Sequence, residues 1–154
     1  MNNEEIKILT SLRRNSREPI SKISNETNTA LSTIYDKLKR LEEKYIKKHT
    51  SLLNFEKLGF KIKANVVINI DKKERETFRR FIEKTNIINS AYKVNHDFDF
   101  IIECIFKDYN QMKLFLEEMD DKFNIKERKV HHLIECIKQE DFLADAGHLT
   151  NIKL

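Results

Sequence analysis

Residues 28–44 read Asn28-Thr-Ala-Leu-Ser-Thr-Ile-Tyr-Asp-Lys-Leu-Lys-Arg-Leu-Glu-Glu-Lys44. Within this stretch the apolar side chains recur three or four residues apart, which is the spacing of one face of an α-helix. The residues that form this face are Leu31, Ile34, Leu38 and Leu41. The stretch therefore predicts an amphipathic helix that buries one stripe against neighbouring elements.

The opposite side of the predicted helix carries short hydroxyls and cations in place of the usual mixture of glutamate and lysine. It presents Ser32, Thr33, Asp36, Lys39 and Arg40, with Tyr35 and Lys37 on its flanks. Such side chains can form hydrogen bonds with phosphates and with the edges of DNA bases. Ordinary surface helices also carry charged outward faces, so the neighbouring elements must decide whether this helix reads DNA.

Two shorter helices are predicted before this one, over residues 4–13 and 21–27, with Pro19 between them. Asn28 lies where a tight turn between helices needs a left-handed backbone, which asparagine tolerates better than most residues. A helix, a short helix, a turn and a long basic helix form the helix-turn-helix layout. The last helix of that layout enters the major groove of DNA.

The net charge of the chain is +4, and its excess lies in the first third. Residues 1–50 contain eleven Lys and Arg against seven Asp and Glu, whereas residues 51–154 contain eighteen of each kind. A polyanion is therefore expected to dock on the N-terminal part. No apolar run approaches the roughly 20 residues that cross a bilayer, and no signal sequence opens the chain, so a cytoplasmic protein without a membrane partner is expected.

Residues 45–53 predict a short strand that forms a wing beside the helices and carries Lys47 and Lys48 toward a DNA backbone. Residues 54–60 predict one helical turn closed by Gly59, which suits a hinge. The wing completes a winged helix-turn-helix domain over residues 1–53.

From residue 61 onward the pattern predicts the order β, α, β, β, α, β. The strands are expected over residues 61–70, 87–94, 98–106 and 130–138, and the helices over residues 72–84 and 110–122. This order builds a ferredoxin-like domain over residues 61–138, an antiparallel sheet with both helices on one face. The predicted fold class is α+β, with residues 139–154 as a C-terminal tail.

The face of the sheet without helices is predicted to be too apolar to remain in water. Strand alternation places Val67, Ile101, Ile105, Leu133 and Ile137 there, beside Asn65, Glu103 and Glu135. A second copy packed sheet to sheet would cover this face and make a homodimer. The alternative is that the tail, residues 139–154, folds over it.

Neither the cysteines nor the histidines predict a metal site or a cofactor. Cys104 and Cys136 lie in strand-like contexts and are expected to be small buried residues without a disulfide. His131 and His132 would point to opposite faces of one strand, and His132 and Cys136 would lie about 13 Å apart along it. Motifs for phosphate loops, nucleophile elbows and zinc proteases are lacking, so no enzyme is predicted.

The sequence resembles the Lrp/AsnC family of leucine-responsive, or feast/famine, transcription regulators of bacteria and archaea. The resemblance covers nearly the whole chain. It is carried by Ile6-Lys-Ile-Leu9, Ser32-Thr33-Ile34-Tyr35, Lys39-Arg40-Leu41-Glu42-Glu43, Leu53 with Glu56-Lys57-Leu58-Gly59, and Asp97-Phe98-Asp99-Phe100.

The resemblance implies a dimeric, sequence-specific DNA-binding transcriptional regulator, often assembled into tetramers or octamers. It also implies an amino acid or similar small effector bound at clefts between dimers, near His96, Asp97 and Asp99. The chain has Tyr45 where the family usually has glycine at the end of the reading helix, and His96 where it usually has glycine in the turn before the third strand. A side chain at position 96 would occupy space that a ligand would use.

Two alternatives to a regulator stay open from the sequence. A branch resembling this family decarboxylates tetrapyrroles of the siroheme type with histidines in the equivalent cleft, and His96 would fit that role. The other alternative is a ligand-sensing or assembly module that does not bind DNA. For the regulator, a dimer that places two reading helices about 34 Å apart predicts a palindromic operator on double-stranded DNA.

Overall fold

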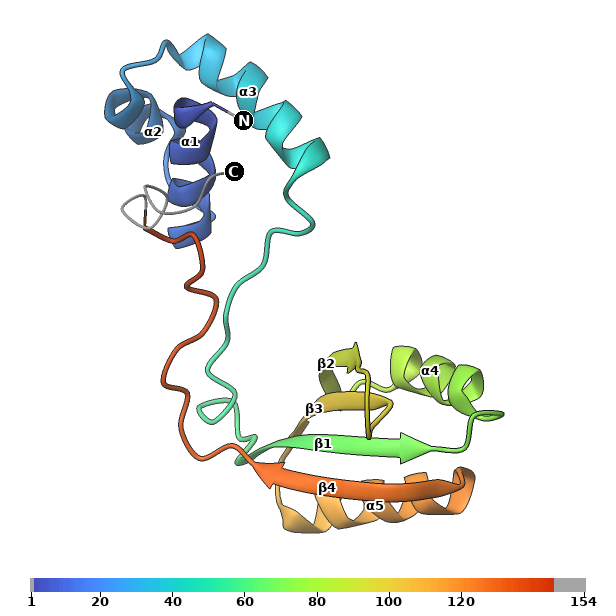
Figure 1. The fold of residues 1–154 in the computed structure, drawn as a ribbon. Coiled ribbons are helices and arrows are strands. Elements are labelled where there is room, and N and C mark those ends of the chain that lie inside the picture. The colour runs from blue at the N-terminus through green and yellow to red at the C-terminus, as the bar shows by residue number, and fades with distance from the viewer. Residues whose placement is uncertain (1, 146–154) are drawn as a thin grey trace. The chain divides into compact units, whose positions relative to one another are not determined.

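The structure is a computed structural model that describes residues 2–145 (Figure 1). The described chain divides into two compact units, a sheet unit over Leu53–Cys136 and a helical unit that contains residues 2–52 together with residues 137–145 of the tail. None of the helices in the described range is long and apolar enough to cross a membrane.

The helical unit consists of α1 (Asn3–Arg14), α2 (Ile20–Thr27) and α3 (Leu31–Lys44). Its core is a small cluster to which every helix contributes: Ile8, Ile23, Ile34 and Leu41, each at most 1% exposed. The predicted inward stripe of α3 is confirmed at Ile34, Leu38 and Leu41. Leu31 is half exposed, because the first residue of α3 lies beyond this small core.

The turn between α2 and α3 has the backbone that the sequence predicts. Asn28 ends α2 in the left-handed conformation with φ 55° and ψ 38°, and its amide donates to the carbonyls of Ser24 and Asn25. At the start of α1, the side chain of Asn2 accepts from the amide of Glu5 while the Glu5 carboxylate accepts from the amide of Asn2. The helix-turn-helix layout is confirmed.

The sheet unit follows the predicted order of elements. It comprises β1 (Ile62–Ile70), α4 (Arg75–Lys84), β2 (Ile88–Lys93), β3 (Phe100–Phe106), α5 (Tyr109–Lys122) and β4 (Ile125–His132). The strands pair antiparallel in the order β2-β3-β1-β4. This is the ferredoxin-like arrangement.

One core joins both helices of the sheet unit to the same face of the sheet. The buried side of β1 alternates as predicted and packs with Phe78 and Ile82 of α4 and with Phe115 and Met119 of α5. Phe78 is fully buried, and its ring contacts the rings of Phe81, Phe100 and Phe123 at centroid distances of 4.9 to 5.9 Å, with Phe81 stacked, Phe100 tilted and Phe123 edge-on. Among residues 2–145, no helix packs on the opposite face of the sheet.

The last strand is displaced from its predicted place at residues 130–138. β4 pairs with β1 from Ile125 opposite Ile70 to His132 opposite Ala64, so the strand ends where its partner begins. The amide of Leu133 makes one more bond, to the carbonyl of Lys63. The prediction that Leu133, Glu135 and Ile137 lie on the uncovered face is therefore wrong, and Ile137 is 92% exposed outside the sheet.

The register of β4 assigns other residues to the uncovered face. One row of paired residues crosses the four strands and consists of Tyr92, Ile101, Val67 and Lys129. A neighbouring row on the same face contains Glu103, Asn65 and His131. Lys63 forms an ion pair with Glu103 at 3.0 Å on the same face. The apolar residues of this face are therefore fewer and more central than predicted.

The predicted strand over residues 45–53 is also wrong. These residues form no strand, and the amide of Ile46 instead bonds the carbonyl of Leu41 at the end of α3. A strand needs a partner for its backbone groups, and none is paired with this segment within the described chain. Residues 54–60 do form the predicted turn, in which the side chain of Asn54 accepts from the amide of Lys57 and Gly59 has φ 91°.

The described part of the tail belongs to the helical unit rather than to the sheet. The alternative in which residues 139–154 cover the sheet is therefore not followed by residues 139–145, and its remainder lies outside the described residues.

The two cysteines differ in environment. Cys104 is buried as predicted, but Cys136 is exposed because β4 ends before it. Burial, helped by the charge of Glu103, raises the pKa of the Cys104 thiol from 9.0 to about 12.

Between these two pH values an unfolded chain loses the Cys104 proton while the folded chain keeps it, so stability should fall as pH rises through this window. At pH 10 this proton loss should lower the free energy of unfolding by about 1.4 kcal/mol. Urea unfolding at pH 8 and pH 10 should show this extra loss in the native protein and in Cys136→Ala, but not in Cys104→Ala. Equal losses in all three proteins would contradict the assignment.

Candidate nucleic-acid interface

The outward face of α3 is exposed over its whole length. Ser32, Thr33, Tyr35, Asp36, Lys39 and Arg40 all lie on the surface of the helical unit. They stand on this side because Ile34 and Leu41 of the same helix are fully buried on the other. The side chains predicted to contact DNA are therefore accessible on this chain.

Lys37 differs from the other predicted contacts. Its side chain is only 14% exposed, and its ammonium group pairs with the carboxylate of Glu4 in α1. Glu4 also accepts from the hydroxyl of Thr29, in the turn before α3. The hydrogen bonds from Lys37 and then Thr29 hold the pKa of Glu4 below its usual value. Lys37 thus ties α3 to α1 instead of pointing into solvent.

The lowered pKa of Glu4 sets the pH range in which this tie stabilises the unit. The contribution is complete above the ordinary carboxyl pKa of 4.5 and disappears as pH falls through the lowered value. At neutral pH α3 is therefore held against α1. Sequence reasoning missed Glu4 and Thr29, because the pairs span 33 and 25 residues and leave no local pattern.

The other cations predicted to contact DNA are more exposed than Lys37. Arg40 is 66% exposed, and its guanidinium lies 3.7 Å from the carboxylate of Glu5. An exposed pair of this kind is worth at most about 1 kcal/mol, so a phosphate can replace the carboxylate. Lys47 and Lys48 are exposed after the C-terminal end of α3, although the wing strand is not formed. The cations therefore extend from α3 into the segment that follows it.

The three predicted effector residues do not share one environment. His96 and Asp97 are exposed in the turn before β3, where the carbonyl of Asp97 accepts from the side chain of Asn69 at 2.7 Å. Asp99 is 7% exposed and accepts from the amide of Ile70 at 2.9 Å while pairing with Arg75 at 2.5 Å. Asp99 therefore joins β3 to the end of β1 and the start of α4.

His96 has a left-handed backbone with φ 70°, at the position where the resemblance expects glycine. Because glycine adopts this conformation without a steric penalty, His96→Gly should leave stability unchanged or raise it by about 0.5–1 kcal/mol. His96→Val should lower it by about 1–2 kcal/mol, since a β-branched residue is strained there. Urea unfolding of the two variants tests this, and equal stabilities would contradict it.

Groups of three or more His, Cys, Asp or Glu side chains placed to hold a metal ion do not occur among residues 2–145. The helical unit also contains a cavity of about 320 Å³ between α1, α2 and the tail, away from the outward face of α3.

The chain is similar to known transcriptional regulators over most of its length. It is 31% identical over 137 residues to an uncharacterised HTH-type transcriptional regulator of Pyrococcus abyssi, covering 88% of this chain and 92% of the relative. It is 32% identical over 122 residues to the HTH-type transcriptional regulator LrpA of Bacillus subtilis, covering 78% and 90%. No family model matches the sequence.

The chain belongs to the Lrp/AsnC family. A solved member of this fold is a transcriptional regulator of Neisseria meningitidis in complex with L-Met, with a TM-score of 0.84, 22% identity and coverage of 90% of this chain and 93% of that one. As an Lrp/AsnC protein, the chain is a DNA-binding transcriptional regulator. The tetrapyrrole decarboxylase and the module without DNA binding are not favoured by its relatives.

Proposed function

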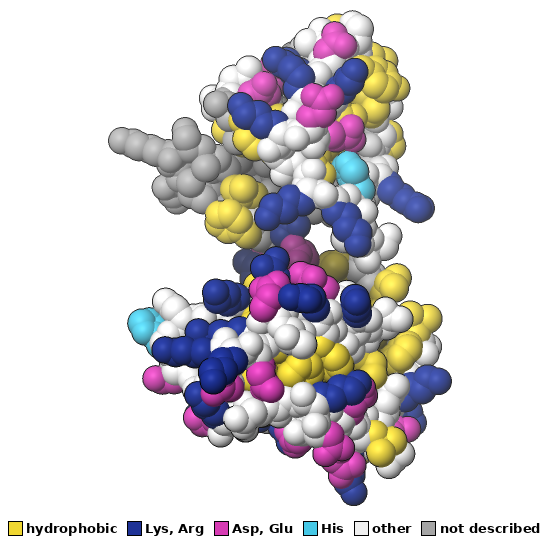
Figure 2. Space-filling view, turned by 90° about the vertical axis from the view of Figure 1, so that its right-hand side faces the viewer, with side chains coloured by type: hydrophobic (Ala, Val, Ile, Leu, Met, Phe, Trp, Pro, Cys, Tyr) yellow, Lys and Arg dark blue, Asp and Glu magenta, His cyan; other side chains and the backbone are white. Residues whose placement is uncertain are grey.

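We propose that this regulator binds a palindromic operator as a homodimer and reads it with the outward face of α3. The observation that carries the proposal is that Ser32, Thr33, Lys39 and Arg40 are exposed on the last helix of the helix-turn-helix. On the face of the molecule that Figure 2 shows, acidic and basic side chains are interleaved. Net charge alone therefore does not mark the site, and the composition of this one helix face does.

Each exposed residue has a role that follows from its chemistry. Lys39 and Arg40 supply phosphate contacts or bonds to guanine, and Ser32 and Thr33 bond base edges or backbone. Tyr35 packs on the sugar-phosphate edge, and Asp36 can accept from a cytosine amino group. Lys47 and Lys48 add attraction that does not depend on sequence. Lys37 acts indirectly, by holding α3 to Glu4.

The homodimer is proposed to form through the uncovered face of the sheet. Ile101 is flanked by Val67 and Tyr92 on neighbouring strands, so apolar side chains occupy the middle of this face. A second copy packed sheet to sheet would remove them from water. Two reading helices about 34 Å apart would then face successive turns of one side of the duplex.

The proposal is tested by the salt dependence of binding to duplex fragments selected from the source genome. Lys39→Ala and Arg40→Ala should each weaken binding and lower the slope of log affinity against log salt by roughly 1 for each lost phosphate contact. Lys113→Ala, an exposed charge on α5, is the matched control and should change neither quantity. Unchanged affinity and slope in both α3 variants would disprove the assignment of this face, and a footprint with a single half-site would disprove the palindrome.

An amino acid or similar effector is proposed to bind between dimers, near the exposed turn that contains His96 and Asp97. The support is the L-Met complex of the similarly folded Neisseria regulator. Titration calorimetry with L-Met and other amino acids should detect binding that Asp97→Ala weakens. Light scattering of the same samples tests whether dimers assemble into tetramers or octamers.

A further inference from the structure

The described end of the chain is held against α1 at its last turn. The guanidinium of Arg13 pairs with the carboxylate of Glu140, and its Nε donates to the carbonyl of Phe142 at 3.2 Å. Beyond this contact the amide of Ala144 donates to the carbonyl of Asp141 at 3.2 Å and forms a turn. One arginine side chain therefore binds both a side chain and the backbone of the tail.

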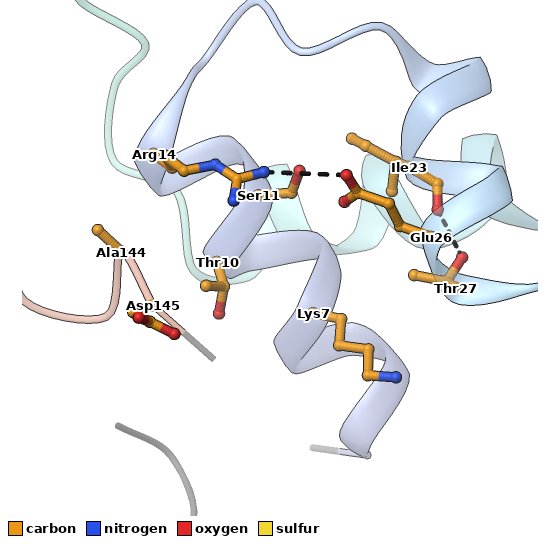
Figure 3. A pocket seen from close by; sticks show the side chains of 9 residues that line it. All are labelled: Lys7, Thr10, Ser11, Arg14, Ile23, Glu26, Thr27, Ala144 and Asp145. Atoms are coloured by element: carbon orange, nitrogen blue, oxygen red, sulfur yellow. Dashed lines mark hydrogen bonds and ion pairs between the residues drawn. The ribbon is translucent and has the colours of Figure 1, made fainter. Parts of the chain in front are cut away.

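The tail also forms one wall of the cavity between α1 and α2 (Figure 3). Ala144 and Asp145 line it opposite Thr10 and Ser11 of α1. Both α1 residues are buried, and the hydroxyl of Ser11 has no hydrogen-bond partner within the described range. The tail thus covers a groove whose floor contains the buried polar side chains of Thr10 and Ser11.

The backbone of the tail adopts conformations that contacts must maintain. Glu140 has φ 53° and Leu143 has φ 62°, and neither is a glycine. Left-handed backbone costs such residues free energy, so a tail without contacts would leave these conformations. Both residues lie within the stretch that Arg13 and the α1–α2 groove hold.

We propose that residues 140–145 are an intramolecular strap whose docking site is Arg13 and the α1–α2 groove. The helical unit is joined to the sheet unit by the chain at residues 52–53 and again at residues 136–137. With the strap undocked, only the connection at residues 52–53 restrains the helical unit. When the strap docks, the connection at residues 136–137 becomes a second restraint. Since Glu4 at the other end of α1 holds Lys37, α1 links the strap to the reading helix.

The strap has a consequence for DNA binding that rests on the proposed function. When one reading helix of a dimer is bound, the second finds its half-site with an effective concentration set by the length and stiffness of its connection. A helical unit attached twice samples fewer positions than one attached once. An undocked strap should therefore weaken binding to a duplex with two half-sites more than binding to one half-site.

Docking is tested by charge reversal on the full chain, with chymotrypsin cleavage after Phe142 as the readout. Phe142 is 70% exposed and lies within the strap, so cleavage requires its local release. Arg13→Glu and Glu140→Arg should each speed cleavage about 5- to 10-fold, and the double variant should return most of the way to the native rate. Arg17→Glu changes the charge equally at an exposed side chain between α1 and α2 that does not line the groove, and should cleave at the native rate.

The effect on DNA is measured with the same four variants. Arg13→Glu should lose about 5- to 10-fold more affinity than Arg17→Glu for a duplex with two half-sites. The two variants should bind a single half-site with equal affinity, and the double variant should recover the two-site affinity. Cleavage that is equally fast in the native protein and Arg13→Glu would overturn the strap. Equal losses of two-site affinity in Arg13→Glu and Arg17→Glu would overturn its role on DNA. If no protein binds DNA, the proposed function fails while the cleavage result still decides docking.

Discussion

Ile101→Asp is expected to convert the proposed dimer into monomers at micromolar concentration and to abolish cooperative binding to an operator with two half-sites. Ile101 occupies the middle of the uncovered sheet face, between Val67 on β1 and Tyr92 on β2. In a symmetric dimer the substitution buries two carboxylates without partners, at a cost of about 3 kcal/mol each. Together they should raise the dimer dissociation constant roughly 10⁴-fold.

The measurement is light scattering over a range of protein concentrations, followed by binding to duplexes with one and two half-sites. Leu114→Asp is the control, because it introduces the same charge at an exposed leucine on α5. The control should remain dimeric and bind as the native protein does. A dimer of unchanged affinity in Ile101→Asp would show that the copies associate through another surface.

Phe78→Ala is expected to cost the sheet unit about 3–5 kcal/mol of unfolding free energy. Phe78 lies on the buried side of α4, where three other phenylalanine rings contact it. Removal of the ring loses both the transfer of apolar surface from water and the contacts between rings, and the neighbours cannot refill the space completely.

Urea unfolding followed by circular dichroism measures the loss. Phe78→Leu keeps most of the apolar volume and should cost less than half as much as the alanine variant. An alanine variant within about 1 kcal/mol of the native protein would mean that this ring cluster does not hold the unit together.

Local patterns in the sequence were sufficient for the elements whose burial is regular. The 3.6-residue spacing of α3 and the strict alternation of β1 both reappear in the structure, because each element buries one face in the core of its own unit. Asn28 was predictable for a different reason, since few side chains tolerate the left-handed turn that the layout needs.

The same reasoning failed where a partner sets the boundary. Apolar and polar residues alternate over residues 130–138, yet β4 covers Ile125–His132. The charged side chains at the start of β4 interrupt the alternation by which a strand is recognised in a sequence. A strand extends only as far as another strand accepts its hydrogen bonds, and β1 begins at Ile62. The same rule explains why residues 45–53 have strand-like composition without forming a strand.

The order of elements, the exposed polar face of α3 and the resemblance to the Lrp/AsnC family were all contained in the amino-acid sequence, because they depend on residue spacing and residue type. The fate of individual side chains was not. Lys37 and Asp99 were candidates for binding, but Glu4 and Arg75 engage them inside their units, and Arg13 engages the tail 127 residues later. Such pairs join residues that the chain keeps far apart, so only the tertiary fold decides which charges stay exposed for a ligand.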